Sequence, residues 1–188
     1  VWENKNKLLE DGEVDCIWGC FSMNGREDKY LWAGPYLYSR QMVAVRMDSE
    51  IQKLKDLTGK MIAVQETSKA EEYFLRSDFE GIPDVSLVYC FSNMDEVFAA
   101  LRKNYVEAIC GHESALISFI NTAPDEYRLL DESFLYSALG VAFDIQYDEE
   151  FVEELFKTLG DMMNDGTIAA IVGKYGLDAE KSLGRGND

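Results

Sequence analysis

Residue types that could support catalysis or metal binding are sparse in this chain. The only histidine, His112, precedes Glu113; these two are the only candidates for a general acid or base, and no nucleophile–base pair is visible. The cysteines show neither C-x-x-C spacing nor a Cys/His cluster, so a zinc site of ordinary ligand count is not expected. We therefore predict no catalytic residue, no metal and no cofactor. We interpret the four cysteines as small buried hydrophobic residues: Cys16, Cys20, Cys90 and Cys110.

One serine is placed where an anion could bind. Ser68 follows the apolar run 61–64 and begins a predicted helix that extends to about residue 76. The N–H groups and the positive dipole end of a helix start suit an anion. An ordinary serine N-cap is the structural alternative, and it is compatible with anion binding.

These residues lie in a chain of alternating strands and helices. Between residues 61 and 121, apolar runs and helical periodicity predict strands at 61–64, 85–89 and 106–110, with helices at 68–76, 94–103 and 114–121. This order is typical of a parallel, doubly wound α/β sheet. Outside it we predict further strands at 14–18, 41–46 and 138–143 and helices at 2–11, 51–57, 149–163 and 168–175.

Composition excludes several classes of partner. The 188 residues are 47% hydrophobic, which is enough for a packed core, and their net charge is −17. A nucleic acid or an anionic membrane face would be repelled by such a surface. No apolar run of about 18 residues exists, so no transmembrane helix is predicted.

Six motifs, in order, give the chain a resemblance to a known family. They begin with Leu9-x-x-Gly12-x-Val14-Asp15, Ser22 followed by Arg26, and Trp32-Ala33-Gly34-Pro35-Tyr36. They continue with Asp56-Leu57-x-Gly59-Lys60-x-Ile62-Ala63-Val64-Gln65, Gly140-Val141-Ala142-Phe143, and Asp165-Gly166-Thr167 with Lys174-Tyr175-Gly176. This pattern resembles the bacterial extracellular solute-binding proteins of family 3, the polar amino-acid receptors of ABC importers.

The resemblance implies a type 2 periplasmic-binding fold with two α/β lobes and a two-strand hinge. One lobe would comprise residues 1–43 and 139–188, and the other residues 44–138. Strand 61–64 would lie between 85–89 and 106–110, so Cys90 and Cys110 should not be bridged. Members of the family begin with elements that this chain lacks, so the first lobe is expected to be incomplete. Its exposed apolar surface would be covered by a second copy, a swapped element or chain outside this sequence.

The family pattern also implies a ligand carboxylate site. Arg26 matches the arginine that holds the carboxylate, and Ser22 matches the preceding hydroxyl residue, although the loop between Asp15 and Arg26 is one residue short. A solvated arginine paired with Glu27 or Asp28 is the alternative for Arg26. Ser68 would hold the carboxylate from the other lobe, with Thr67 replacing the glycine of the family pattern. Gln65 would point into the cleft.

The ammonium site departs from the family pattern. The expected aspartate position falls on His112, with Glu113 one residue beyond it, and either side chain could hold the ammonium. Trp2 matches an aromatic residue that lines the cleft, and core packing is its alternative.

These features predict a binding protein for a small solute, most simply an amino acid or a similar zwitterion. It would act outside the cytoplasm, tethered to a membrane in the full-length protein, with an ABC permease or with a kinase or cyclase module as the sensor domain of a receptor. An enzyme on the same scaffold, related to dehydratases or lytic transglycosylases, and a purely structural domain are the alternatives.

Overall fold

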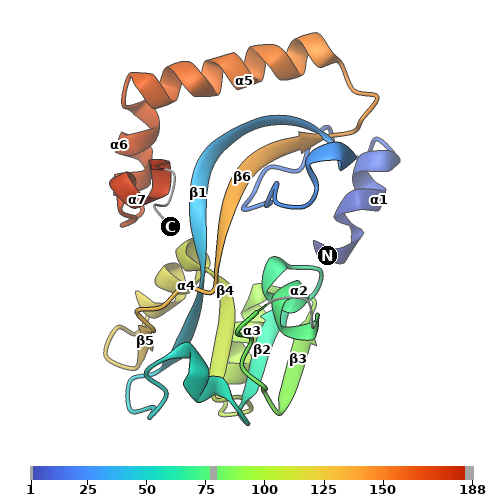
Figure 1. The fold of residues 1–188 in the computed structure, drawn as a ribbon. Helices are drawn as coiled ribbons and strands as arrows, with labels where there is room; N and C mark the ends of the chain where they lie inside the picture. Colours follow the sequence, from blue (N-terminus) through green and yellow to red (C-terminus); the bar gives the residue numbers. More distant parts are fainter. Residues whose placement is uncertain (1, 77–79, 185–188) are drawn as a thin grey trace. The chain divides into compact units, whose positions relative to one another are not determined.

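The computed structural model describes residues 2–76 and 80–184, and the chain folds into two compact units. Unit 1 comprises Val1–Glu3 and Arg40–Leu135, and unit 2 comprises Asn4–Ser39 and Tyr136–Asp188. The family resemblance implied boundaries near residues 43 and 139. Strands β1 (Leu31–Arg46) and β6 (Leu135–Phe143) both continue from one unit into the other (Figure 1).

The sheet of unit 1 is built around β2 (Met61–Gln65). Parallel strands β3 (Leu87–Phe91) and β4 (Ala108–His112) flank it on either side, which confirms the predicted strand order. Cys90 and Cys110 are free thiols, as that order predicts. Beyond β4 the order continues with β1 and β5 (Tyr127–Leu129), both antiparallel to their neighbours, and β6 pairs with β1. The sequence pattern did not indicate β5.

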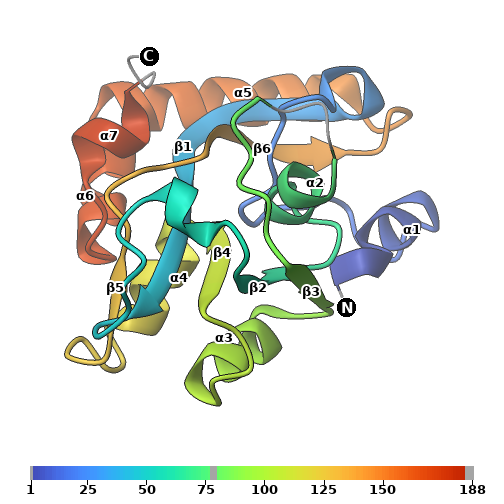
Figure 2. The ribbon, with the colours of Figure 1, turned by 60° about the horizontal axis from the view of Figure 1, so that its bottom comes forward.

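Helices cover both faces of this sheet. α2 (Lys69–Leu75) packs Tyr73 and Phe74 on the face that carries Ile62 and Val64. α3 (Met94–Arg102) and α4 (Glu113–Ile120) pack on the face that carries Ala63 and Ile109. Figure 2 shows α2 and α3 on opposite sides of β2 and β3. The doubly wound arrangement follows from strands that are apolar on both faces.

The flanking strands β3 and β4 begin two residues later than predicted. β2 begins at Met61, whose partner in β3 is Leu87, so residues 85 and 86 precede the parallel ladder. The shift carries β4 through His112, so this histidine is the last residue of a strand and Glu113 the first residue of a helix. The predicted helix at 51–57 is reduced to the 3-10 turn η3 (Leu54–Leu57).

Unit 2 combines short N-terminal elements with three C-terminal helices. The 3-10 turn η1 (Trp2–Asn4), whose first two residues belong to unit 1, leads into α1 (Lys5–Glu10) of unit 2, and η2 (Glu27–Lys29) precedes β1. α5 (Glu149–Asn164), α6 (Thr167–Lys174) and α7 (Ala179–Leu183) follow β6. Ala33, Val141 and Phe143 form the core with Val152 and Leu159 of α5. α7 was not predicted.

The predicted strand at 14–18 is wrong. Only Ile17 forms a bridge, antiparallel to Ala142 of β6, and Ile17 is buried. Val14 and Trp18 are 38% and 54% exposed. Residues 14–18 pair with β6 at this one position only, so the segment is irregular and does not form a strand.

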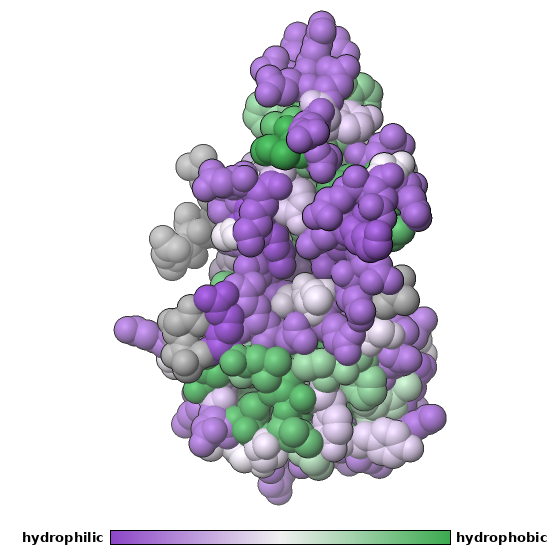
Figure 3. Space-filling view, turned by 90° about the vertical axis from the view of Figure 1, so that its right-hand side faces the viewer, coloured by the Kyte–Doolittle hydropathy of each residue, from purple (hydrophilic) through white to green (hydrophobic). Residues whose placement is uncertain are grey.

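Exposed apolar side chains occur in both units. Unit 2 exposes Trp18, and α5 exposes Phe151 and Phe156; the prediction that a partner covers this unit stays a prediction. In unit 1 the edge strand β3 exposes Leu87, and α2 exposes Leu75. Figure 3 shows the apolar area over this part of unit 1 in green. Across the described residues, the helices are too short or too polar to cross a membrane.

Candidate functional site

Arg26 of unit 2 is held in place on three sides. Its guanidinium Nη1 donates a hydrogen bond to the backbone oxygen of Ser22 at 3.1 Å. The guanidinium carbon lies 4.9 Å from the ring centroid of Phe21, a cation–π distance. The indole N–H of Trp32 donates to the backbone oxygen of Arg26 at 3.1 Å. Arg26 is half-buried, and these contacts fix its guanidinium and its backbone oxygen; the planar guanidinium suits a carboxylate.

Ser22 is placed to support this segment. Its residue is 2% exposed, and its hydroxyl donates to Oδ1 of Asn24 at 3.1 Å while accepting the Asn24 backbone N–H at 3.3 Å. The hydroxyl is therefore engaged within the loop, close to Arg26. The structure brings Ser22 and Arg26 together, and it adds Asn24, which the sequence analysis did not single out.

In unit 1, Gln65 is the last residue of β2, and residues 66–68 connect this strand to α2. Ser68 is the N-cap of α2, and its side chain accepts the backbone N–H of Glu71 at 3.2 Å. The backbone N–H of Thr67 donates to Oε2 of Glu71 at 2.7 Å. Two N–H groups at this helix start are thus used within the loop. Thr67 has a φ of 55°, a conformation that glycine adopts readily and a β-branched residue rarely does.

Acidic side chains surround this connection. The carboxyl of Glu66 has a raised pKa, chiefly because its side chain hydrogen bonds to Glu3, with further contributions from the charges of Glu71 and Glu96. Burial and a hydrogen bond to Glu71 raise the pKa of the Cys90 thiol to about 12. Trp2, the aromatic residue predicted to line the cleft, directly precedes Glu3 in η1. Concentrated negative charge weakens anion binding at this end of β2 and favours a cation.

At the end of β4, the two predicted ammonium ligands are each matched with a residue of β1. Gln41 pairs in register with His112, and its Nε2 lies 3.1 Å from the imidazole nitrogens. Arg40 forms a two-bond ion pair with Glu113, in which Nε donates to Oε2 at 3.0 Å and Nη2 donates to Oε1. The side chains of Arg40 and Glu113 are 19% and 18% exposed. Polar residues at positions 40 and 41, just before a buried run of β1, were the signal that sequence reasoning missed.

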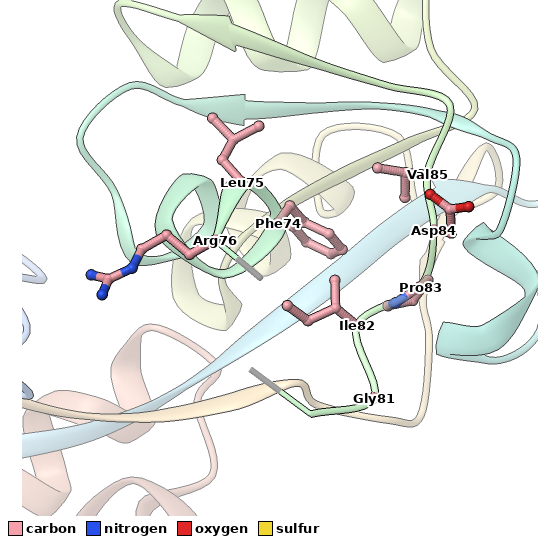
Figure 4. A pocket seen from close by; sticks show the side chains of 8 residues that line it. All are labelled: Phe74, Leu75, Arg76, Gly81, Ile82, Pro83, Asp84 and Val85. Carbon is pink, nitrogen blue, oxygen red and sulfur yellow. The ribbon is translucent and has the colours of Figure 1, made fainter. Parts of the chain in front are cut away.

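An open pocket of about 390 Å³ also lies in unit 1 (Figure 4). Its walls come from the end of α2 and from the segment before β3, and in Figure 4 the side chains of Phe74 and Ile82 extend toward one another. It contains none of the predicted site residues. Among the residues that the structure describes, no group of three or more histidine, cysteine, aspartate or glutamate side chains could hold a metal ion.

Comparison with known proteins identifies the family. The profile of the bacterial extracellular solute-binding proteins, family 3, matches residues 1–178. The glutamate-binding protein GluB of Corynebacterium efficiens is 27% identical over 172 residues, which are 87% of this chain and 56% of that protein. GluB of Corynebacterium glutamicum is 25% identical over 89% of this chain and 58% of its own length. The chain therefore spans a little over half the length of these curated relatives.

Solved structures agree on the fold. The crystal structure of Tv2483 bound to L-arginine matches with a TM-score of 0.80 and 26% identity, over 93% of this chain and 70% of that one. The cysteine-binding protein of Campylobacter jejuni matches with a TM-score of 0.83 over 97% of this chain and 75% of that one; its 20% identity supports the fold alone. The similarity to these structures supports the type 2 periplasmic-binding fold that the family resemblance implied. The family and these relatives are solute-binding proteins rather than enzymes. With nearly the whole sequence matched, the chain belongs to the bacterial extracellular solute-binding proteins, family 3.

Proposed function

We propose that this protein binds an amino acid outside the cytoplasm and that Arg26 receives the ligand's carboxylate. The observation that carries the proposal is the fixed guanidinium of Arg26, with one N–H on the Ser22 carbonyl and its plane near the Phe21 ring. Bidentate recognition of a carboxylate is what a pre-oriented arginine does best, because little rotamer entropy is lost on binding.

Unit 1 would supply the remaining groups. Each carboxylate oxygen of Glu113 accepts one hydrogen bond from Arg40, and the remaining lone pairs can accept a ligand ammonium. His112 is the other candidate at this corner. Ser68 and the backbone of Thr67 are proposed as further carboxylate contacts, which requires the ligand carboxylate to replace that of Glu71 on the Thr67 N–H. Gln65 and Trp2 are proposed as walls. That groups of both units contact one ligand, with β1 and β6 as the hinge, is the family-based part of the proposal.

The acidic side chains around Glu66 indicate which amino acid should be tested first as a ligand. Glu3, Glu66, Glu71 and Glu96 favour a ligand with a cationic side chain over one with a second carboxylate. The solved Tv2483 structure contains L-arginine, and the GluB relatives are named for glutamate. We therefore propose L-arginine as the first ligand and L-glutamate as its comparison.

The names of the relatives favour a role as the binding protein of an ABC importer. A protein of Vibrio harveyi, 28% identical over 93% of this chain and 70% of its own length, is named as a proposed amino-acid ABC transporter-binding protein, PatH. We propose an ABC permease as partner, with membrane tethering of the full-length protein. A receptor sensor linked to a kinase or cyclase would use the same binding step. Contact with a second copy or a swapped element is proposed for the exposed apolar residues of unit 2.

Calorimetry on the 188-residue chain tests the proposal. Arg26→Ala should weaken L-arginine binding by roughly tenfold to more than a hundredfold, because a charge-assisted contact contributes about 1.5–3 kcal/mol. Arg26→Lys should recover only part of this loss. Arg102→Ala is the matched control, since Arg102 also stacks on an aromatic ring, Phe119 at 5.6 Å, and its loss should leave the affinity unchanged. Wild-type affinity in Arg26→Ala would contradict the proposal.

A further inference from the structure

The segment that leads to Arg26 runs beside β6 as an antiparallel partner for only a few residues. Ser22 and Leu139 form an isolated bridge. The N–H of Gly140 donates to the Phe21 oxygen at 3.3 Å, and the N–H of Met23 donates to the Ala138 oxygen at 2.8 Å. In a regular antiparallel ladder, the next bond would join the N–H of Ala138 to the oxygen of Met23.

That bond is replaced by a side chain. The Ala138 N–H donates to Oδ1 of Asn24 at 2.9 Å, and Nδ2 of Asn24 donates to the Tyr136 oxygen at 3.3 Å. The Met23 oxygen instead accepts the N–H of Arg26 at 2.9 Å, which closes a turn over residues 23–26. The amide of Asn24 thus stands in for the backbone of a continuing strand, while the real backbone turns away.

We propose that Asn24 is a positioning residue for ligand recognition by Arg26. By satisfying Ala138, it frees the Met23 carbonyl to close the turn that places Arg26. The inference rests on the proposed function, in which Arg26 binds the ligand carboxylate. Ser22 acts in the same unit, because its hydroxyl donates to the Asn24 oxygen and accepts the Asn24 N–H.

The N–H groups of Arg26 and Ala138 can compete for one acceptor, the Met23 carbonyl. Without the Asn24 amide, the N–H of Ala138, a half-buried residue, would lose its partner, and a hydrogen bond left unmade away from water is unfavourable. The nearest remedy is the Met23 oxygen, the acceptor that a regular ladder would use. Taking it would release the Arg26 N–H and open the turn. Gly25, with a φ of 69°, shows that the turn needs a left-handed residue, which a continuing strand would not need.

Amide hydrogen exchange in the 188-residue chain, measured by NMR, directly tests whether the Asn24 side chain keeps the Met23 carbonyl available for Arg26. In the wild type both the Arg26 and the Ala138 amides should be protected. In Asn24→Ala we expect Ala138 to stay protected and Arg26 to lose at least about tenfold of its protection. Asn24→Asp keeps an oxygen acceptor and should protect Arg26 as the wild type does. Equal protection of Arg26 in Asn24→Ala, or its loss in Asn24→Asp, would overturn the inference.

Calorimetry with L-arginine tests the link to binding. Asn24→Ala should weaken binding by about tenfold in the wild type and by less than about twofold in an Arg26→Ala background, because a residue acting through Arg26 is coupled to it. Asp148→Ala, which removes the N-cap of α5 in the same unit, is the control for a general loss of stability and should leave the affinity unchanged. Wild-type affinity in Arg26→Ala would refute the proposed function; a weakened Arg26→Ala with an unaffected Asn24→Ala would refute only the positioning role.

Discussion

Replacing Glu113 with glutamine should lower both the folding stability and the ligand affinity of this protein. The Glu113 carboxylate accepts Nε and Nη2 of Arg40, which joins the first turn of α4 to β1. In the proposed function the same carboxylate accepts the ligand ammonium. Glutamine has almost the same shape, so the change removes the charge while keeping the packing.

The size of the stability loss follows from the burial of the pair. Breaking a fully buried ion pair costs about 3–5 kcal/mol, whereas an exposed pair contributes about 0–1 kcal/mol. Arg40 and Glu113 are 19% and 18% exposed, which places the pair between these limits, and we expect a decrease of about 1–3 kcal/mol in the free energy of unfolding. Loss of a charge-assisted contact to the ammonium should weaken L-arginine binding by roughly tenfold to a hundredfold.

Urea unfolding and calorimetry on the same preparations separate the two effects. Glu72→Gln is the control, because Glu72 is a partly buried carboxylate of unit 1 that pairs with Lys69 at 2.7 Å and has no proposed ligand contact. It should lose stability and keep its affinity. An unchanged affinity in Glu113→Gln would refute the ammonium role, and an unchanged free energy of unfolding would refute the contribution assigned to the ion pair.

Two further substitutions test the connection from β2 to α2. Thr67→Gly should raise the free energy of unfolding by up to about 1 kcal/mol. A left-handed φ costs a non-glycine residue about 1–2 kcal/mol, and the extra chain entropy that glycine loses on folding offsets about 0.5–1 kcal/mol of this gain. A lower stability in urea unfolding would contradict the strain at Thr67. Glu66→Gln should stabilise the protein at pH 7. The folded-state pKa of Glu66 is raised above 4.5, so the folded state binds the proton more tightly and stability is lost as pH rises through that pKa. The gain should vanish at pH 4, and an equal gain at both values would contradict this cause.

The βαβαβ part of unit 1 was predictable because its signals are local. Buried parallel strands are continuous apolar runs, and Ser68 marks a helix start in the sequence as it does in the structure. The two-residue error in β3 and β4 has a non-local cause, since their first paired residue is set by where β2 begins. In unit 2 the run 14–18 failed as a strand, because an apolar pattern cannot show that only Ile17 would meet β6.

The candidate site was predictable in part for the same reason. Arg26 could be selected from its residue type and the family pattern. The residues that hold the site residues in place could not be predicted in this way. The partners of Glu113 and His112 lie 73 and 71 residues away in sequence, and the Asn24 side chain bonds to Ala138 across 114 residues. Asn24 also has an ordinary local interpretation, since an Asn-Gly pair is a common turn signal. Only the register against β6 reveals that its amide replaces a backbone carbonyl.

These long-range hydrogen bonds share one feature that bears on how binding would be transmitted. Arg40 and Gln41 lie on β1 directly after the boundary between Ser39 and Arg40, and Asn24 bonds to Tyr136 and Ala138 directly after the boundary between Leu135 and Tyr136. The groups that hold His112 and Glu113 therefore lie on β1 itself, and the side chain of Asn24, in the turn before Arg26, bonds to the backbone of β6. Substitutions at Asn24 or Arg40 should consequently affect ligand affinity without any contact between the substituted side chain and the ligand.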